Sequence, residues 1–161
     1  MRVENYPQIT VIVDTREQAP LNISMYETEL GTLPVGDYGI KNFSDWNCPD
    51  FIVERKSISD LVGSLTCGRT RFMREIMKLR QFRFKALLIE GTREDIVAGE
   101  YQSKASPASV IGSLDAICVR TGVHVFWCRD SEGAARQLES LVRQFARGIE
   151  KDWNRLRGRS V

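Results

Sequence analysis

The sequence lacks the features that mark a membrane or secreted protein. No apolar run approaches the roughly 18 residues that a membrane span needs, and the N-terminus has no hydrophobic signal segment. The four cysteines are scattered, with no Cys-x-x-Cys pair. Cys118, His124 and Cys128 lie on an apolar background, where such residues more often belong to a core than to a zinc site. We therefore expect a soluble, intracellular protein with reduced thiols.

Repeats, low-complexity tracts and long linkers are also missing. The 161 residues are 42% hydrophobic and 27% charged, which is ordinary for one globular domain. We therefore expect a single domain over residues 1–161, with a core at about 9–150 and a basic C-terminal helix and tail at about 131–161. No glycine-rich phosphate loop of the form G-x-x-x-x-G-K or G-x-G-x-x-G is present, which disfavours a nucleotide-dependent enzyme.

Charge is distributed unevenly along the chain. Residues 1–60 carry ten acidic and five basic side chains, whereas residues 61–161 carry eleven acidic and eighteen basic ones. The densest stretch, residues 67–85, has seven basic residues against one Glu. Its basic residues include Arg69 and a helical stripe of Arg71, Arg74 and Lys78, which indicates a polyanionic partner. The alternative is an ordinary solvated helix face, because Phe72, Met73, Ile76 and Leu79 occur at core spacing.

Strands and helices are expected to alternate. Runs rich in apolar and β-branched residues predict strands at Ile9–Asp14, Phe51–Arg55, Phe84–Ile89 and Val123–Cys128. Capping patterns predict helices that begin after Ser57, at Thr92, at Ser106-Pro107 and at Asp130 or Ser131. Because residues 21–50 are short-stranded and rich in turns, we expect an α/β fold with a mixed central sheet flanked by helices.

The last helix is long for one that only covers a sheet. Its apolar residues fall on one stripe: Leu138, Leu141, Val142, Phe145 and Ile149, extended by Trp153 and Leu156. Two interpretations stay open, a cover for the sheet alone or a surface that also binds a partner.

Three acidic residues accompany the predicted strands and their turns. Asp14 ends the first strand, Asp37 follows the turn Leu33-Pro34-Val35-Gly36, and Glu54 lies within the strand at 51–56. Side chains alternate along a strand, so Glu54 and Lys56 share one face. Carboxylates that hold Mg²⁺, beside a lysine that orients or activates water, suit phosphodiester hydrolysis. The alternative is a surface salt bridge at Glu54 and a simple turn role for Asp37.

The residues around these acids form a longer, multi-part motif. Its segments are Val13-Asp14-Thr15-Arg16-Glu17, Leu33 to Tyr38 with Gly36-Asp37, Glu54-Arg55-Lys56 to Asp60-Leu61, and Gly68-Arg69. Together they closely resemble the nuclease domain of the XPF family of structure-selective endonucleases. The family signature is Gly-Asp, then at variable distance Glu-Arg-Lys, three residues and Asp. Every fixed position is matched, and the resemblance runs from about Ile9 to about Phe145.

The resemblance implies a restriction-endonuclease-like core and Mg²⁺- or Mn²⁺-dependent cutting of branched, flap or fork DNA in repair, recombination or replication. It implies that Asp14, Asp37 and Glu54 hold the metal and that Lys56 is the catalytic base or orients water. The supporting motif residues would be Arg16, Glu17, Arg55 and Asp60, and Arg69 would receive the DNA backbone. Asp60 also fits the helix cap after Ser57, and Arg55 fits either a salt bridge behind the site or a phosphate contact.

Family members usually carry a tandem helix-hairpin-helix module, and some carry a helicase part; we see neither in this sequence. The preferred DNA structure therefore stays open, and a partner subunit could supply duplex binding. The family commonly pairs through its nuclease domain, so the stripe from Leu138 to Leu156 is a candidate homodimer face. The alternative function is a non-catalytic DNA-binding or scaffold subunit, which the intact Gly-Asp and Glu-Arg-Lys residues disfavour. We expect a cytoplasmic, nucleoid-associated protein in a prokaryote or phage and a nuclear one in a eukaryote.

Overall fold

The computed structural model describes residues 9–41, 50–156 and 158, and the side chain of Trp153 lies outside that description. Within these residues a mixed sheet has the strand order β2-β1-β3-β4-β5-β6. The strands are β1 (Thr10–Asp14), β2 (Glu27–Gly31), β3 (Tyr38–Ile40), β4 (Phe51–Ser57), β5 (Phe84–Glu90) and β6 (His124–Trp127). The helices are α1 (Ile58–Leu65), α2 (Arg69–Leu79), α3 (Arg93–Ala98), α4 (Pro107–Thr121) and α5 (Ser131–Leu156).

The sheet has two halves of different direction. β4, β5 and β6 run parallel, which requires the helical crossovers that follow β4 and β5. β3 pairs antiparallel with both β1 and β4, and β2 pairs parallel with β1. The expected mixed sheet is therefore confirmed, and the region of residues 21–50 supplies its two short strands within the described part of the chain.

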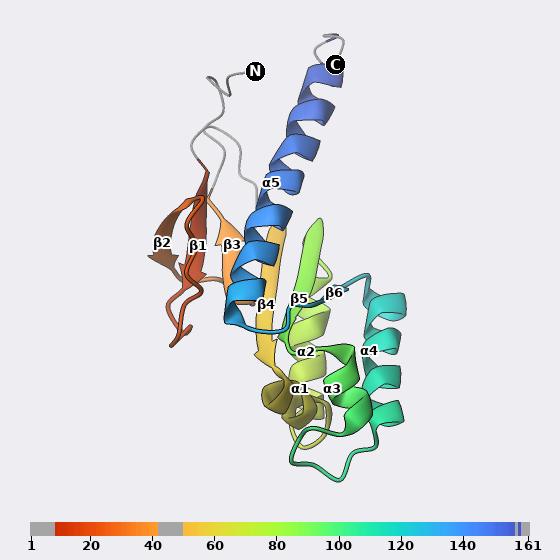
Figure 1. The fold of residues 1–161 in the computed structure, drawn as a ribbon. Coiled ribbons are helices and arrows are strands. Elements are labelled where there is room, and N and C mark those ends of the chain that lie inside the picture. Colours follow the sequence, from red (N-terminus) through yellow and green to blue (C-terminus); the bar gives the residue numbers. More distant parts are fainter. Residues whose placement is uncertain (1–8, 42–49, 157, 159–161) are drawn as a thin grey trace.

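Two apolar cores lie on opposite faces of the sheet (Figure 1). On one face, Ile52, Leu87 and Ile89 pack against side chains of α1, α2, α3 and α4. On the other face, Val53 and Leu88 pack against α5. β4 is buried at residues 51–53 and β5 at residues 86–89. Because alternate residues of these stretches enter different cores, the two strands are fixed in register.

The helix starts follow the predicted caps. The hydroxyl of Ser57 accepts a hydrogen bond from the Asp60 backbone N–H (3.1 Å), and α1 therefore begins directly after β4. Thr92 and Asp95 form a complete capping box, and the Ser106 hydroxyl caps α4. Gly122 ends α4 in the left-handed conformation with φ 69°, as its position after the predicted helix suggested.

α5 extends well past the sheet that it covers (Figure 1). Leu138 and Val142 are buried in the core, and Leu141 and Phe145 pack at its margin. Leu156, at the end of the predicted stripe, is 80% exposed. The stripe therefore covers the sheet along only part of the helix. None of the helices in the described ranges combines the length and apolar character needed to cross a membrane.

Candidate active site

The strand β4 places Glu54 and Lys56 side by side. Lys56 Nζ lies 3.1 Å from Glu54 Oε1, and the two side chains are only 15% and 13% exposed. The ammonium group also lies over the ring of Phe72 on α2, 5.1 Å from its centroid. The expectation that these two side chains share a face is confirmed, and the pair is enclosed between the strand and α2 rather than free on the surface.

A tight turn before β3 brings Asp37 to the same strand. The Asp37 backbone N–H donates to Val53 O (2.8 Å), and Asp37 Oδ2 accepts from the Arg55 backbone N–H (2.7 Å). Gly36 has φ +77°, and a Cβ there would lie 2.7 Å from Ile52 Cγ1. Only glycine avoids both the strain and the clash. The Gly-Asp pair of the motif therefore has a local physical reason, which is to dock Asp37 beside Glu54.

The two carboxyl groups resist ionising together. Burial raises the pKa of Glu54 to about 7, and the charge of Asp37 adds to this against the opposing effect of Lys56. Burial also raises the pKa of Asp37, with the charges of Glu17 and Asp14 contributing and the Arg55 hydrogen bond opposing. A bound cation would relieve this repulsion. Hard carboxylate oxygens suit Mg²⁺ or Mn²⁺, so the pair fits such an ion on chemical grounds.

Asp14 is adjacent but already fully engaged. It is completely buried, and its oxygens accept hydrogen bonds from Arg16 N, Nε and Nη2 and from Leu33 N, at 2.6–3.0 Å. Chiefly through Arg16, the pKa of this carboxyl falls to about 2. Its backbone N–H donates to Asp37 O (2.8 Å), so Asp14 lies next to the pair. In the described part of the chain, no three His, Cys, Asp or Glu side chains are arranged to hold a metal ion together.

Arg55 points to the opposite face and closes a network behind the site. Its guanidinium pairs with Glu90 and with Glu17 Oε2 (3.3 Å) and donates to Ala19 O (2.6 Å). The Tyr38 hydroxyl accepts from Leu21 N (2.9 Å) and donates to Glu17 Oε2 (3.5 Å). The sequence left two interpretations of Arg55 open, a salt bridge behind the site or a phosphate contact, and in the structure Arg55 forms the salt bridge. Glu17 belongs to this network as well.

Glu90 is the network residue that the sequence analysis missed. β4 and β5 run parallel in register, with Arg55 opposite Leu88, so Glu90 lies two residues further along on the same face. The sequence does show an acidic residue at the end of the predicted strand that contains Phe84–Ile89. Its role could be recognised only once the pairing of that strand with the Glu-Arg-Lys strand was known.

Asp60 serves the junction between strand and helix. Besides the backbone bond described above, its Oδ2 accepts from the Ser57 hydroxyl (2.8 Å), and its side chain is exposed. This cap fixes the chain directly after Lys56, which supports the competing interpretation of Asp60 as a helix-capping residue.

The basic residues of α2 divide between two sides of the helix. Phe72, Ile76 and Leu79 are buried, while Arg71, Arg74 and Lys78 are exposed. Arg71 pairs with Glu75 (3.0 Å), whose charge also contributes to the raised pKa of Glu54, so this side of α2 faces the carboxylates. Arg69 lies on the other side, where its Nη1 donates to the hydroxyl of Ser113 on α4 (3.2 Å). The side chain of Arg16 is 63% exposed and forms an ion pair with Asp14. The charges of Asp37 and Glu54 also contribute to raising the pKa of its guanidinium.

Comparisons with known proteins agree on one family. The model of the ERCC4 domain matches residues 13–141. The 3′-flap repair endonuclease Xpf of Saccharolobus solfataricus is 32% identical over 150 residues, covering 89% of this chain and 58% of its own length. The DNA repair endonuclease XPF of Mus musculus is 30% identical over 148 residues, covering 86% of this chain and 15% of its own length.

A solved structure is similar over most of the chain. XPF from Aeropyrum pernix in complex with DNA has a TM-score of 0.69 and 26% identity, covering 88% of this chain and 66% of that one. This likeness confirms the expected restriction-endonuclease-like α/β core. The chain spans little more than half the length of the archaeal curated relative and a much smaller part of the mouse one.

Proposed function

This chain belongs to the ERCC4-domain family of XPF endonucleases, and on that premise we propose that it is a metal-dependent DNA endonuclease. Its substrates are branched, flap or fork DNA structures that arise in repair, recombination or replication. The single observation that carries the proposal is the half-buried group of Asp37, Glu54 and Lys56, set beside the basic face of α2.

Asp37 and Glu54 hold the metal ion in this proposal, and Asp14 keeps the adjoining backbone in place. A bound Mg²⁺ or Mn²⁺ supplies charge neutralisation at the scissile phosphate and promotes ionisation of water at neutral pH. The ammonium group of Lys56 orients the attacking water and stabilises the negative charge that develops on the scissile phosphate. Phe72 and Glu54 fix the position of its Nζ. Arg55 holds Asp37 through its backbone N–H and anchors Glu17 through its side chain.

DNA binding rests on the exposed cations of α2. Arg71, Arg74 and Lys78 line the side of the helix next to the carboxylates and the outer surface that continues from it. Lys and Arg in such a stripe bind backbone phosphates without sequence preference, which suits an enzyme that recognises DNA structure. Arg16 lies at the edge of the same carboxylate group and is placed to meet a phosphate while it holds Asp14.

We also propose that the protein works as a homodimer or with a partner subunit that contributes duplex binding. The part of α5 that extends past the sheet, with Leu156 exposed, supports this assignment. We propose that it localises to the nucleoid in a prokaryote or phage-infected cell and to the nucleus in a eukaryote. No role at a membrane is proposed.

A cleavage assay on labelled DNA tests the proposal. The panel comprises a single strand, a duplex, a 3′ flap, a splayed fork and a four-way junction, each with Mg²⁺, Mn²⁺ or EDTA. We expect cutting near the junctions that requires the metal and is absent in Glu54→Gln. If no substrate is cut but DNA is bound tightly without metal, the endonuclease proposal fails and the scaffold function replaces it.

A further inference from the structure

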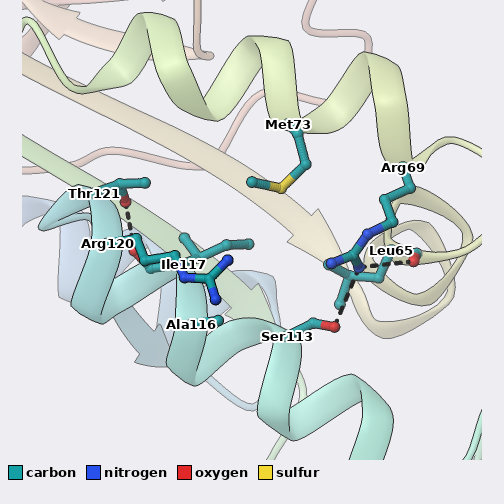
Figure 2. Close-up of a pocket in the computed structure, with 8 residues that line it drawn as sticks. All are labelled: Leu65, Arg69, Met73, Ser113, Ala116, Ile117, Arg120 and Thr121. Atoms are coloured by element: carbon teal, nitrogen blue, oxygen red, sulfur yellow. Dashed lines mark hydrogen bonds between the residues drawn. The ribbon is translucent and has the colours of Figure 1, made fainter.

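A hollow lies between α2 and α4 (Figure 2). It is open to solvent. Its floor includes Leu65, Met73 and Ile117, and its polar groups include Arg69, Ser113 and Arg120. We refer to these six residues as the α2–α4 groove. Figure 2 shows the guanidinium groups of Arg69 and Arg120 projecting into it from two different helices.

Neither arginine of the α2–α4 groove is neutralised by a carboxylate. Arg69 Nη1 donates to the Ser113 hydroxyl (3.2 Å) and to Leu65 O (3.4 Å), and both of these acceptors are uncharged. Within residues 9–41, 50–156 and 158, neither Arg69 nor Arg120 forms an ion pair. By contrast, Arg16, Arg55, Arg71, Arg83 and Arg136 each pair with an acid. Two unpaired guanidinium groups over one hollow attract an anion.

The position of the groove relates it to the candidate active site. Residues 69 and 73 of α2 line the groove, while Arg71 and Glu75, about half a turn away, face the carboxylates. The groove and the carboxylates therefore lie on different sides of α2.

We propose that the α2–α4 groove binds a backbone phosphate of the DNA substrate, at a point separate from the bond that is cut. The inference rests on the proposed function and extends it by a second contact point. Arg69 and Arg120 donate hydrogen bonds to the phosphate oxygens, and the Ser113 hydroxyl lies where it can add another.

Fluorescence anisotropy with a labelled splayed fork tests the groove directly. All variants carry Glu54→Gln so that the DNA stays intact. Arg120→Gln and Arg69→Gln are each expected to weaken binding about 3- to 10-fold and to lower the salt slope by about one. Arg143→Gln is the matched control, because Arg143 is an exposed arginine on the part of α5 that covers the other face of the sheet. Thermal melts show whether each variant is folded. Arg120 is the cleaner site, because Arg69 also donates hydrogen bonds to Leu65 O and the Ser113 hydroxyl.

Shortened forks locate the phosphate. When the arms are trimmed one nucleotide at a time from each end, the loss caused by Arg120→Gln should disappear at one defined arm length. Equal affinity and salt slope in Arg120→Gln and the parent overturn the groove proposal, and so does an equal loss in Arg143→Gln. If the protein with Glu54 intact still cuts forks in that case, the proposed function survives. Absence of both binding and cutting in the wild type removes both proposals.

Discussion

Neighbouring residues of β4 meet two electrostatic environments that differ in how completely their charges are satisfied. On one face, Glu54 pairs with Lys56, and its pKa is raised to about 7. On the other face, Arg55 engages Glu90, Glu17 and a backbone carbonyl. The side of Glu54 is electrostatically incomplete, whereas the side of Arg55 is complete without any ligand.

The difference separates groups that await a substrate from groups that hold the fold. A buried carboxylate with a raised pKa destabilises the folded state when it is ionised. Such groups are common at functional sites, where a ligand or a reaction offsets the destabilisation. A charge network with every member paired has no such unmet demand. Asp14 belongs with the complete side, because its four hydrogen bonds hold its pKa at about 2. The experiments below alter one side at a time.

The largest expected effect is loss of cutting on the incomplete side. Asp37→Asn or Lys56→Ala should lower single-turnover cleavage by at least about 1,000-fold, because metal binding or charge stabilisation is lost. DNA affinity and the circular dichroism melt should change little, since neither side chain supports the core. A wild-type cleavage rate in either variant would remove the roles assigned to these residues.

On the complete side, the main effect should be on stability. Arg55→Ala leaves Glu90 and Glu17 without their shared cation, and we expect a loss of about 3 kcal/mol in the free energy of unfolding. Urea denaturation measures it. The matched control is Arg83→Ala, which removes an exposed pair with Asp152 and should cost less than about 1 kcal/mol. Equal losses in the two variants would show that the Arg55 network does not brace the fold.

Asp14 should make the stability of the fold depend on pH in the acid range. Its pKa is lowered from 3.8 to about 2, so its stabilising effect is present above pH 3.8 and is lost as the pH falls through 2. Asp14→Asn should therefore cost about 2 kcal/mol at neutral pH, with the gap from wild type closing toward pH 2. Denaturation in EDTA at a series of pH values measures this without a metal contribution. A gap that stayed constant with pH would contradict the assigned charge effect.

Glu54 should show the opposite pH dependence, with the smallest magnitude. Its folded pKa is raised from 4.5 to about 7, so its destabilising effect is absent below pH 4.5 and grows as the pH rises through 7. In EDTA at pH 8, Glu54→Gln should stabilise the fold by about 1 kcal/mol, less than the pKa alone gives because Lys56 loses its partner. Added Mg²⁺ should raise the melting temperature of wild type only. A less stable Glu54→Gln protein would place Glu54 among the groups that hold the fold.

Local signals in the sequence predicted much of the fold. Ser57, Thr92 and Ser106 cap the helices that their patterns indicated. The period of two along β4 placed Glu54 and Lys56 together and Arg55 opposite. These features depend on residues within one or two turns of one another, so one stretch of sequence contains the whole cause.

The features that escaped prediction depend on contacts distant in the chain. Glu90 meets Arg55 only through the pairing of β5 with β4, and Arg120 shares a hollow with Arg69 only because α4 packs beside α2. The motif grouped Asp14 with the metal ligands, but no sequence signal indicated that Leu33 N and Arg16 would occupy its oxygens. The metal role of Asp14 stays a prediction.

The alternation along β4 also constrains which length changes the family can accept. A single residue inserted or deleted between 51 and 54 would send the carboxylate of Glu54 toward α5 and the guanidinium of Arg55 toward α2, so each charge would enter the environment of the other. Natural variation in chain length should therefore accumulate in the connections, such as residues 99–106, while this short strand keeps an invariant number of residues.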